Sequence, residues 1–113
     1  MSAIIFEVPG PLFGYRRVMD RGGYSTYAKF KKRVLLIAQA KGWPGLVKTS
    51  SEWPCHFSVH VAWRLKPRID WPNVYKGIED ALFEQDRYVL PGDRNNVIWN
   101  TKEAEHAIVQ INF

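Results

Sequence analysis

Apolar residues follow two periods along the chain, which predict strands in some segments and helices in others. Segments 25–42 and 71–85 carry apolar residues at helical spacing, so each predicts a helix with one apolar stripe. Strict alternation over residues 56–65 predicts a strand whose buried face holds Phe57, Val59, Val61, Trp63 and Leu65. Short apolar runs predict four further strands, at 3–8, 88–90, 96–99 and 107–113. These elements predict one α+β domain over residues 1–113, with a mixed sheet and two main helices.

The ends of the two predicted helices carry residues with known end preferences. Ser25 is a suitable N-cap for the first helix, and Gly42 is a suitable residue to end it. Asp70 is a plausible N-cap for the second helix, and Pro72 falls in the first turn, where the missing N–H of proline does no harm. The irregular stretches 9–24 and 42–54 read as loops within the same domain.

Charge is distributed unevenly along the 113 residues. The net charge is +5, yet residues 1–66 hold 11 Lys and Arg against 3 Asp and Glu, while residues 67–113 hold 5 against 8. A basic half suits a polyanion such as nucleic acid, and an acidic half suits a divalent cation. Many basic proteins bind no nucleic acid, so charge alone also allows an interaction protein unrelated to it.

Cys55 is the single cysteine, which excludes a disulfide within the chain and a cysteine-rich zinc site. Cys55 has no neighbour that would lower its pKa, and we expect it to be structural. No apolar run approaches the roughly 20 residues that cross a bilayer, and the first residues have no signal-peptide pattern. We therefore expect a cytoplasmic protein with no membrane partner.

Polar residues of the second predicted helix gather on one side. Asn73, Lys76 and Asp80 cluster beside Asp70, opposite an arc formed by Trp71, Val74, Tyr75, Ile78, Ala81 and Leu82. Two interpretations are open. Carboxylates could bind a cation while Lys76 neutralises charge on a scissile phosphate. Alternatively, Asp70 only caps the helix, and Lys76 and Asp80 form an i,i+4 ion pair on a solvated face.

The segment 68–82, Arg-Ile-Asp-Trp-Pro-Asn-Val-Tyr-Lys-Gly-Ile-Glu-Asp-Ala-Leu, resembles a family signature. The signature is Asp-x-Asp-Asn-x-x-Lys-x-x-x-Asp-Ala-Leu, found in RusA-like Holliday-junction resolvases. Six positions match in register: Asp70, Asn73, Lys76, Asp80, Ala81 and Leu82. The opening Phe-Glu-Val-Pro-Gly-Pro at 6–11, followed by Arg16 and Arg17, is also similar to the start of that family.

The resemblance implies a RusA-like fold and a homodimeric endonuclease of bacteria or their phages, which cuts four-way DNA junctions in recombination and repair. It implies Mg²⁺ (or Mn²⁺) as cofactor, with Asp70 as a metal ligand and Lys76 stabilising charge in the transition state. Asp93 would be the second catalytic carboxylate and metal ligand. Asp80 and Asp86 are less favoured alternatives as ligands. A water molecule activated by the metal would be the nucleophile.

Two positions depart from the family pattern. Pro72 stands where the family has its second aspartate, and the paired Asp-Asp that follows the helix is reduced to Asp93 in Pro91-Gly92-Asp93-Arg94. Two carboxylates still suffice for a magnesium ion that keeps several waters. The departures nevertheless motivate an alternative: a RusA-fold protein with weakened or lost catalysis that binds DNA or a partner protein.

Basic residues of the first half are the expected DNA contacts, together with the signature asparagine: Arg16, Arg17, Arg21, Lys29, Lys31, Lys32, Arg33 and Asn73. Tyr15, Tyr24 and Tyr27 lie among them and could stack on exposed bases. The alternative is a solvated helix face with the tyrosines anchored in the core. His56 and His60 share one strand face and could approach a metal, although a place on the sheet surface is the more ordinary role.

Overall fold

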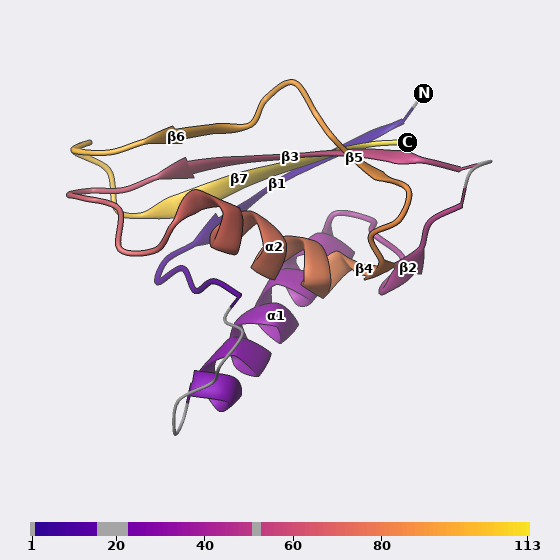
Figure 1. Cartoon of the computed structure of the whole chain (residues 1–113), viewed down its shortest axis with the longest axis horizontal. Helices are drawn as coiled ribbons and strands as arrows, with labels where there is room; N and C mark the ends of the chain where they lie inside the picture. Colours follow the sequence, from indigo (N-terminus) through magenta and orange to yellow (C-terminus); the bar gives the residue numbers. More distant parts are fainter. Residues whose placement is uncertain (1, 16–22, 51–52) are drawn as a thin grey trace.

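The computed structural model describes residues 2–15, 23–50 and 53–113, with only the backbone given for 23–25. Over these residues the chain forms two helices and seven strands. A five-stranded sheet lies above both helices, which cover the same face of it (Figure 1). In chain order the elements are β1 (Ala3–Pro9), α1 (Gly23–Ala40), β2 (Val47–Lys48), β3 (Cys55–Ala62), α2 (Trp71–Leu82), β4 (Phe83–Gln85), β5 (Val89–Pro91), β6 (Asn96–Ile98) and β7 (His106–Asn112).

The sheet is mixed, as the sequence predicts. Its order is β1-β7-β3-β5, and β6 pairs with a later stretch of β3. β7 runs antiparallel to both β1 and β3, whereas β5 and β6 run parallel to β3. β2 and β4 form a separate two-stranded parallel ribbon. The predicted α+β class is therefore confirmed.

The core lies between the helices and one face of the sheet. The alternating residues Phe57, Val59 and Val61 of β3 are fully buried there. The apolar arc of α2 is also confirmed, because Val74, Ile78, Ala81 and Leu82 are buried and Trp71 and Tyr75 pack against them. α1 contributes the predicted stripe through Tyr27, Phe30, Val34 and Ala38.

The prediction for Leu65 is wrong. Its side chain is 71% exposed, because β3 ends at Ala62, where its pairing with β6 ends. Ser58, expected on the outer face, is 2% exposed because the loop after β5 covers it. Gly92 approaches Ser58 so closely that a Cβ at residue 92 would collide with the Ser58 hydroxyl.

The helix boundaries differ from the sequence prediction at three of four ends. α1 begins at Gly23, so Ser25 lies inside the helix and is not its N-cap. α1 ends at Ala40, and Gly42 then takes a φ of 102°. The Trp43 and Gly42 amides donate to the Ala38 and Gln39 carbonyls, the pattern of a Schellman cap. Gly42 thus ends the helix as expected, from just beyond it.

α2 begins as predicted and ends early. Asp70 is extended, and its carbonyl accepts from the Asn73 and Val74 amides, although its side chain makes no cap hydrogen bond. Pro72 lies in the first turn. The predicted end at residue 85 is wrong because Phe83 turns extended and pairs with Val47 of β2.

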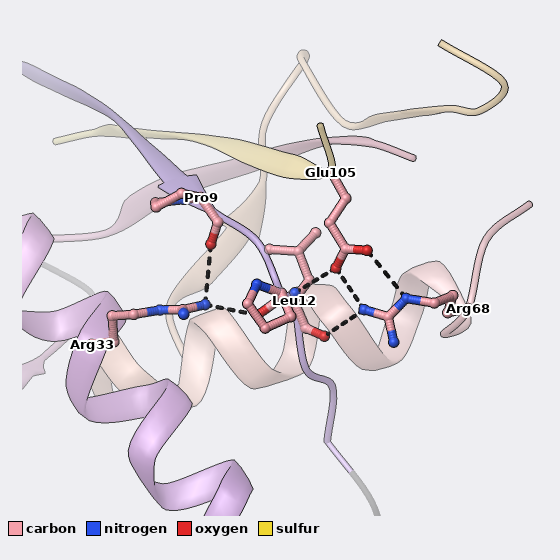
Figure 2. Close-up of polar contacts among 6 residues, drawn as sticks. Pro9, Leu12, Arg33, Arg68 and Glu105 are labelled. Atoms are coloured by element: carbon pink, nitrogen blue, oxygen red, sulfur yellow. Dashed lines mark hydrogen bonds and ion pairs between the residues drawn. The ribbon is translucent and has the colours of Figure 1, made fainter. Parts of the chain in front are cut away.

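A bridge centred on Glu105, hereafter the Glu105 bridge, joins three distant parts of the chain (Figure 2). Its carboxylate accepts from the Arg68 guanidinium at 2.6 Å and from the Leu12 amide at 2.6 Å. Arg68 also donates to the Leu12 carbonyl at 3.3 Å. Burial disfavours the Glu105 carboxylate, but the bonds from Arg68 and Leu12 outweigh it and lower the pKa of Glu105. The bridge fixes the loop that leads into α2.

We expect Glu105→Gln to lower the free energy of unfolding by about 1.5–3 kcal/mol at pH 7, because it weakens hydrogen bonds made to a charge. A lowered pKa in the folded state gives stability that is present above the usual glutamate pKa and is lost as pH falls below it. The deficit of the variant should therefore shrink below about pH 4. Urea unfolding at several pH values measures it, with exposed Glu7→Gln as control. A deficit that does not vary with pH would contradict this account.

Candidate functional site

Lys76 lies at the centre of a cluster of carboxylates, hereafter the Lys76 cluster. Its ammonium is 3.0 Å from an oxygen of Asp80, 3.0 Å from one of Asp86 and 3.7 Å from one of Glu79. Glu79 and Asp80 reach Lys76 because residues three and four apart share a helix face. Asp86 follows β4, so it comes to Lys76 from outside the helix. The i,i+4 pair predicted for Lys76 and Asp80 is confirmed.

Lys76 is held in its charged form. Partial burial disfavours the ammonium, but hydrogen bonds to Asp86 and Asp80 outweigh burial and raise the pKa of Lys76. The bond from Lys76 in turn lowers the pKa of Asp86. Asp80 also accepts a hydrogen bond from the Tyr27 hydroxyl at 3.0 Å, which connects the cluster to α1.

Glu79 is the buried member of the cluster, only 6% exposed. Burial is the main cause that raises the pKa of Glu79 to about 7; the Lys76 charge opposes it, and the Asp86 and Asp80 charges reinforce it. Tyr75, beside Glu79, has a raised pKa through burial and the Glu79 charge. Near neutral pH the buried Glu79 carboxyl is therefore partly protonated.

The two carboxylates predicted to share a metal have different surroundings. Asp70 is exposed at the start of α2. Asp93 follows β5 and borders a pocket that includes Ser58 and His60, on the sheet face turned away from the helices. The same loop continues to Asn95, which borders a second pocket together with Trp71. The loop that carries Asp93 thus reaches the first turn of α2.

In the described part of the chain no three His, Cys, Asp or Glu residues are arranged to hold a metal ion. Asp80 and Asp86, the less favoured predicted ligands, are ion-paired with Lys76. His56 is exposed and His60 half-buried on the sheet. The two-carboxylate site of Asp70 and Asp93 stays a prediction.

The predicted DNA contacts fall into three groups. Arg16, Arg17 and Arg21 lie outside the described residues, as does the side chain of Tyr24. Lys29 and Lys32 are exposed on α1, and the Lys31 ammonium lies 4.8 Å from the centre of the Tyr27 ring. Of the remaining two, Arg33 is engaged within the protein through its side chain and Asn73 through its backbone alone.

Arg33 and Asn73 both contact the loop after β1. The Arg33 guanidinium donates to the carbonyls of Pro9 at 3.1 Å and Pro11 at 2.7 Å (Figure 2). The Asn73 backbone carbonyl accepts from the Tyr15 amide at 2.8 Å. Tyr27 is 5% exposed and is therefore a core anchor, as the alternative interpretation has it.

Sequence reasoning missed Glu79, and it named Asp86 only as a less favoured metal ligand, without its contact with Lys76. Glu79 lies three residues after Lys76, and its helical position could have indicated a contact with that lysine. Asp86 could not be found in this way, because it lies beyond the end of the helix.

Comparison of the sequence with protein-family models and with curated proteins found no match. Among the residues that the structure describes, no helix is both long and apolar enough to cross a membrane.

The raised pKa of Glu79 predicts a pH-dependent stability. Between the usual glutamate pKa of 4.5 and about 7, the folded state binds a proton that the unfolded state releases. The free energy of unfolding therefore falls as pH rises through this window, by about 1–3 kcal/mol. Glu79→Gln should remove this fall, whereas exposed Glu84→Gln should keep it. Urea unfolding at pH 5, 6, 7 and 8 tests this, and an equal fall in Glu79→Gln would refute it.

Proposed function

We propose that the protein is a metal-dependent endonuclease of the RusA-like class that cuts branched DNA such as four-way junctions. The observation that carries the proposal is the resemblance of residues 68–82 to that family's signature. The arrangement of α2 supports it: the signature residues Ala81 and Leu82 are buried, while Lys76 and Asp80 pair on the other side. One segment thus anchors the helix and presents polar groups.

Asp70 and Asp93 carry carboxylate oxygens, the donors that a hard cation takes. The Asp70 side chain makes no hydrogen bond or ion pair with any residue that the structure describes, so its carboxylate oxygens are uncommitted. Asp93 is likewise exposed at the loop that reaches α2. Magnesium is commonly held by one or two carboxylates together with water and substrate phosphate. Asp70 and Asp93 would hold it, and the ion would supply Lewis-acid polarisation of the phosphate and an activated water.

Lys76 has the donors to assist. An ammonium carries three N–H groups, and two of them are directed to Asp80 and Asp86 at 3.0 Å. Glu79 lies farther from the ammonium, at 3.7 Å, so the third N–H is the one that could turn to a phosphate oxygen, and the side chain is 37% exposed. The two carboxylates fix the position of the ammonium, so it needs little rearrangement when charge develops on the phosphate.

Wider features agree with a DNA substrate. Lys29 and Lys32 lie exposed on α1, where they can contact phosphates. The resemblance to the family implies a homodimer, since two sites are required for symmetric cuts, and a place in the cytoplasm of a bacterial host. The alternative is a RusA-fold protein that binds DNA or a partner without cutting, which is favoured by Pro72 at the position of the family's second aspartate.

Cleavage of a synthetic four-way junction at low salt with Mg²⁺ or Mn²⁺ tests the proposal. We expect paired nicks from the wild type, no detectable nicks from Asp70→Asn, and a rate about 10²–10³-fold lower in Lys76→Ala. Exposed Glu84→Gln is the control and should cut normally. Sedimentation of the same samples tests the dimer.

If neither the wild type nor any variant nicks the junction, the proposed nuclease activity is refuted. Junction binding that does not depend on magnesium would then select the non-cutting alternative. Binding without steep salt dependence would exclude a DNA partner altogether.

A further inference from the structure

A pocket opens at the end of the sheet where α2 begins, distinct from the Lys76 cluster. It has a volume of about 710 Å³, within the range of small-ligand sites. The loop after β3 and the turn after β6 supply most of its lining, which comprises Trp63, Arg64, Leu65, Lys66, Arg68, Trp99, Asn100 and Glu105. Most of that lining is apolar, with cationic side chains among it.

Backbone hydrogen bonds hold the two walls of the pocket together. The Asn100 amide donates to the Leu65 carbonyl at 3.1 Å, and the Thr101 amide donates to the Trp63 carbonyl at 3.2 Å. Asn100 has a φ of 61°, a left-handed conformation that asparagine tolerates better than most residues. This turn carries Trp99, so the position of Trp99 is set by the backbone of both walls.

The apolar surface of the pocket is exposed. Trp99 is 56% exposed and Leu65 is 71% exposed. Trp63 is buried behind them, with the Arg68 guanidinium 5.5 Å from its ring centre. An exposed indole held on a fixed turn offers a flat face for stacking, and every nucleic-acid base has a matching π-face.

The charge at the pocket favours an anion. Arg64 and Lys66 are exposed and make no ion pair within the described ranges. Glu105 is the one carboxylate in the lining, and the Glu105 bridge already directs its oxygens to Arg68 and the Leu12 amide. The pocket therefore combines an aromatic face with two uncommitted positive charges.

We propose that this pocket binds an unpaired base of DNA, stacked on Trp99, with the flanking phosphates on Arg64 and Lys66. This inference rests on the proposed function in taking DNA as the partner, and it adds a second contact that selects strands with unstacked bases. The loop 63–70 leads directly from the pocket to Asp70. A base held here would lie next to the proposed cutting site.

Charge also argues against a second copy of this chain as the occupant. The protein carries a net charge of +5, so two copies would repel at a surface lined by Arg64, Lys66 and Arg68. DNA carries the complementary charge. An acidic apolar peptide would also carry negative charge, but its binding would not depend on a nucleic-acid base, so the abasic strand described below distinguishes the two.

The affinity for a labelled oligodeoxythymidine of about ten nucleotides, measured by fluorescence anisotropy in EDTA to exclude cleavage, tests the inference. We expect Trp99→Ala to weaken binding roughly 5- to 100-fold and Trp99→Phe to keep most of it. An otherwise identical abasic strand should bind wild type as weakly as the normal strand binds Trp99→Ala. Trp99→Ala should not distinguish the two strands.

Trp53→Ala is the matched tryptophan control, because Trp53 lies near Phe113 at the far end of the sheet. It should bind as wild type does, and circular dichroism verifies the fold of each variant. Equal affinity of wild type for normal and abasic strands would overturn the inference, as would an unchanged affinity in Trp99→Ala.

The phosphate contacts have their own measurement. Arg64→Ala and Lys66→Ala should each reduce the slope of log affinity against log salt by about 0.7, and exposed Lys48→Ala should leave it unchanged. Thymidine monophosphate should compete only weakly with the strand. Strong competition would show that the pocket binds a free nucleotide and would overturn the proposed binding of a DNA strand.

The outcomes separate this inference from the nuclease. If the protein cuts junctions but neither Trp99→Ala nor an abasic strand changes binding, the proposed nuclease activity is supported and the proposed base-binding pocket is refuted. If binding depends on the base and on Trp99 but no junction is cut, the base-binding pocket is supported and the nuclease activity is refuted.

Discussion

The packing of α2 against one face of the sheet is the interaction on which the other features depend. Val74, Ile78 and Leu82 are fully buried against the fully buried residues of β3. Full burial of side chains of this size contributes about 1.5–3 kcal/mol each. Because this arc fixes the rotation of α2 about its axis, it also fixes the direction of the opposite side. The Lys76 cluster is therefore positioned by apolar packing, and its ion pairs adjust within a direction already set.

Periodicity revealed the elements whose burial is one-sided and continuous. α2 and β3 were predicted because their apolar residues repeat over several turns or pleats, and the structure confirms both. β2 and β4 were not predicted, since they are two and three residues long and stabilise each other across a gap of more than 30 residues. Leu65 continued the alternation beyond the last strand pairing, where the pattern no longer reports burial. Ser58 is buried by a loop that no local pattern reveals.

The candidate site shows the same division between local and distant contacts. The Lys76–Asp80 pair follows from helix geometry alone, and it was foreseen. Asp86 joins that pair from beyond the end of α2, so the effects that raise the pKa of Lys76 include one from outside the helix. Arg33 seemed free to bind a ligand as part of a basic run, yet its guanidinium holds the loop after β1. Charge in a sequence indicates where cations are, and tertiary contacts decide which remain free.

The central place of β7 sets the order in which the molecule can assemble during synthesis. β1 pairs only with β7 in the five-stranded sheet, so the backbone of β1 has no strand partner until β7 has been synthesised. The Glu105 bridge has the same dependence, because Leu12 and Arg68 await a residue 93 and 37 positions later. Contacts of such high sequence separation form slowly. On the ribosome, β5 and β6 can pair with β3 before β7 emerges, whereas β1 stays unpaired until β7 joins it to the rest of the sheet.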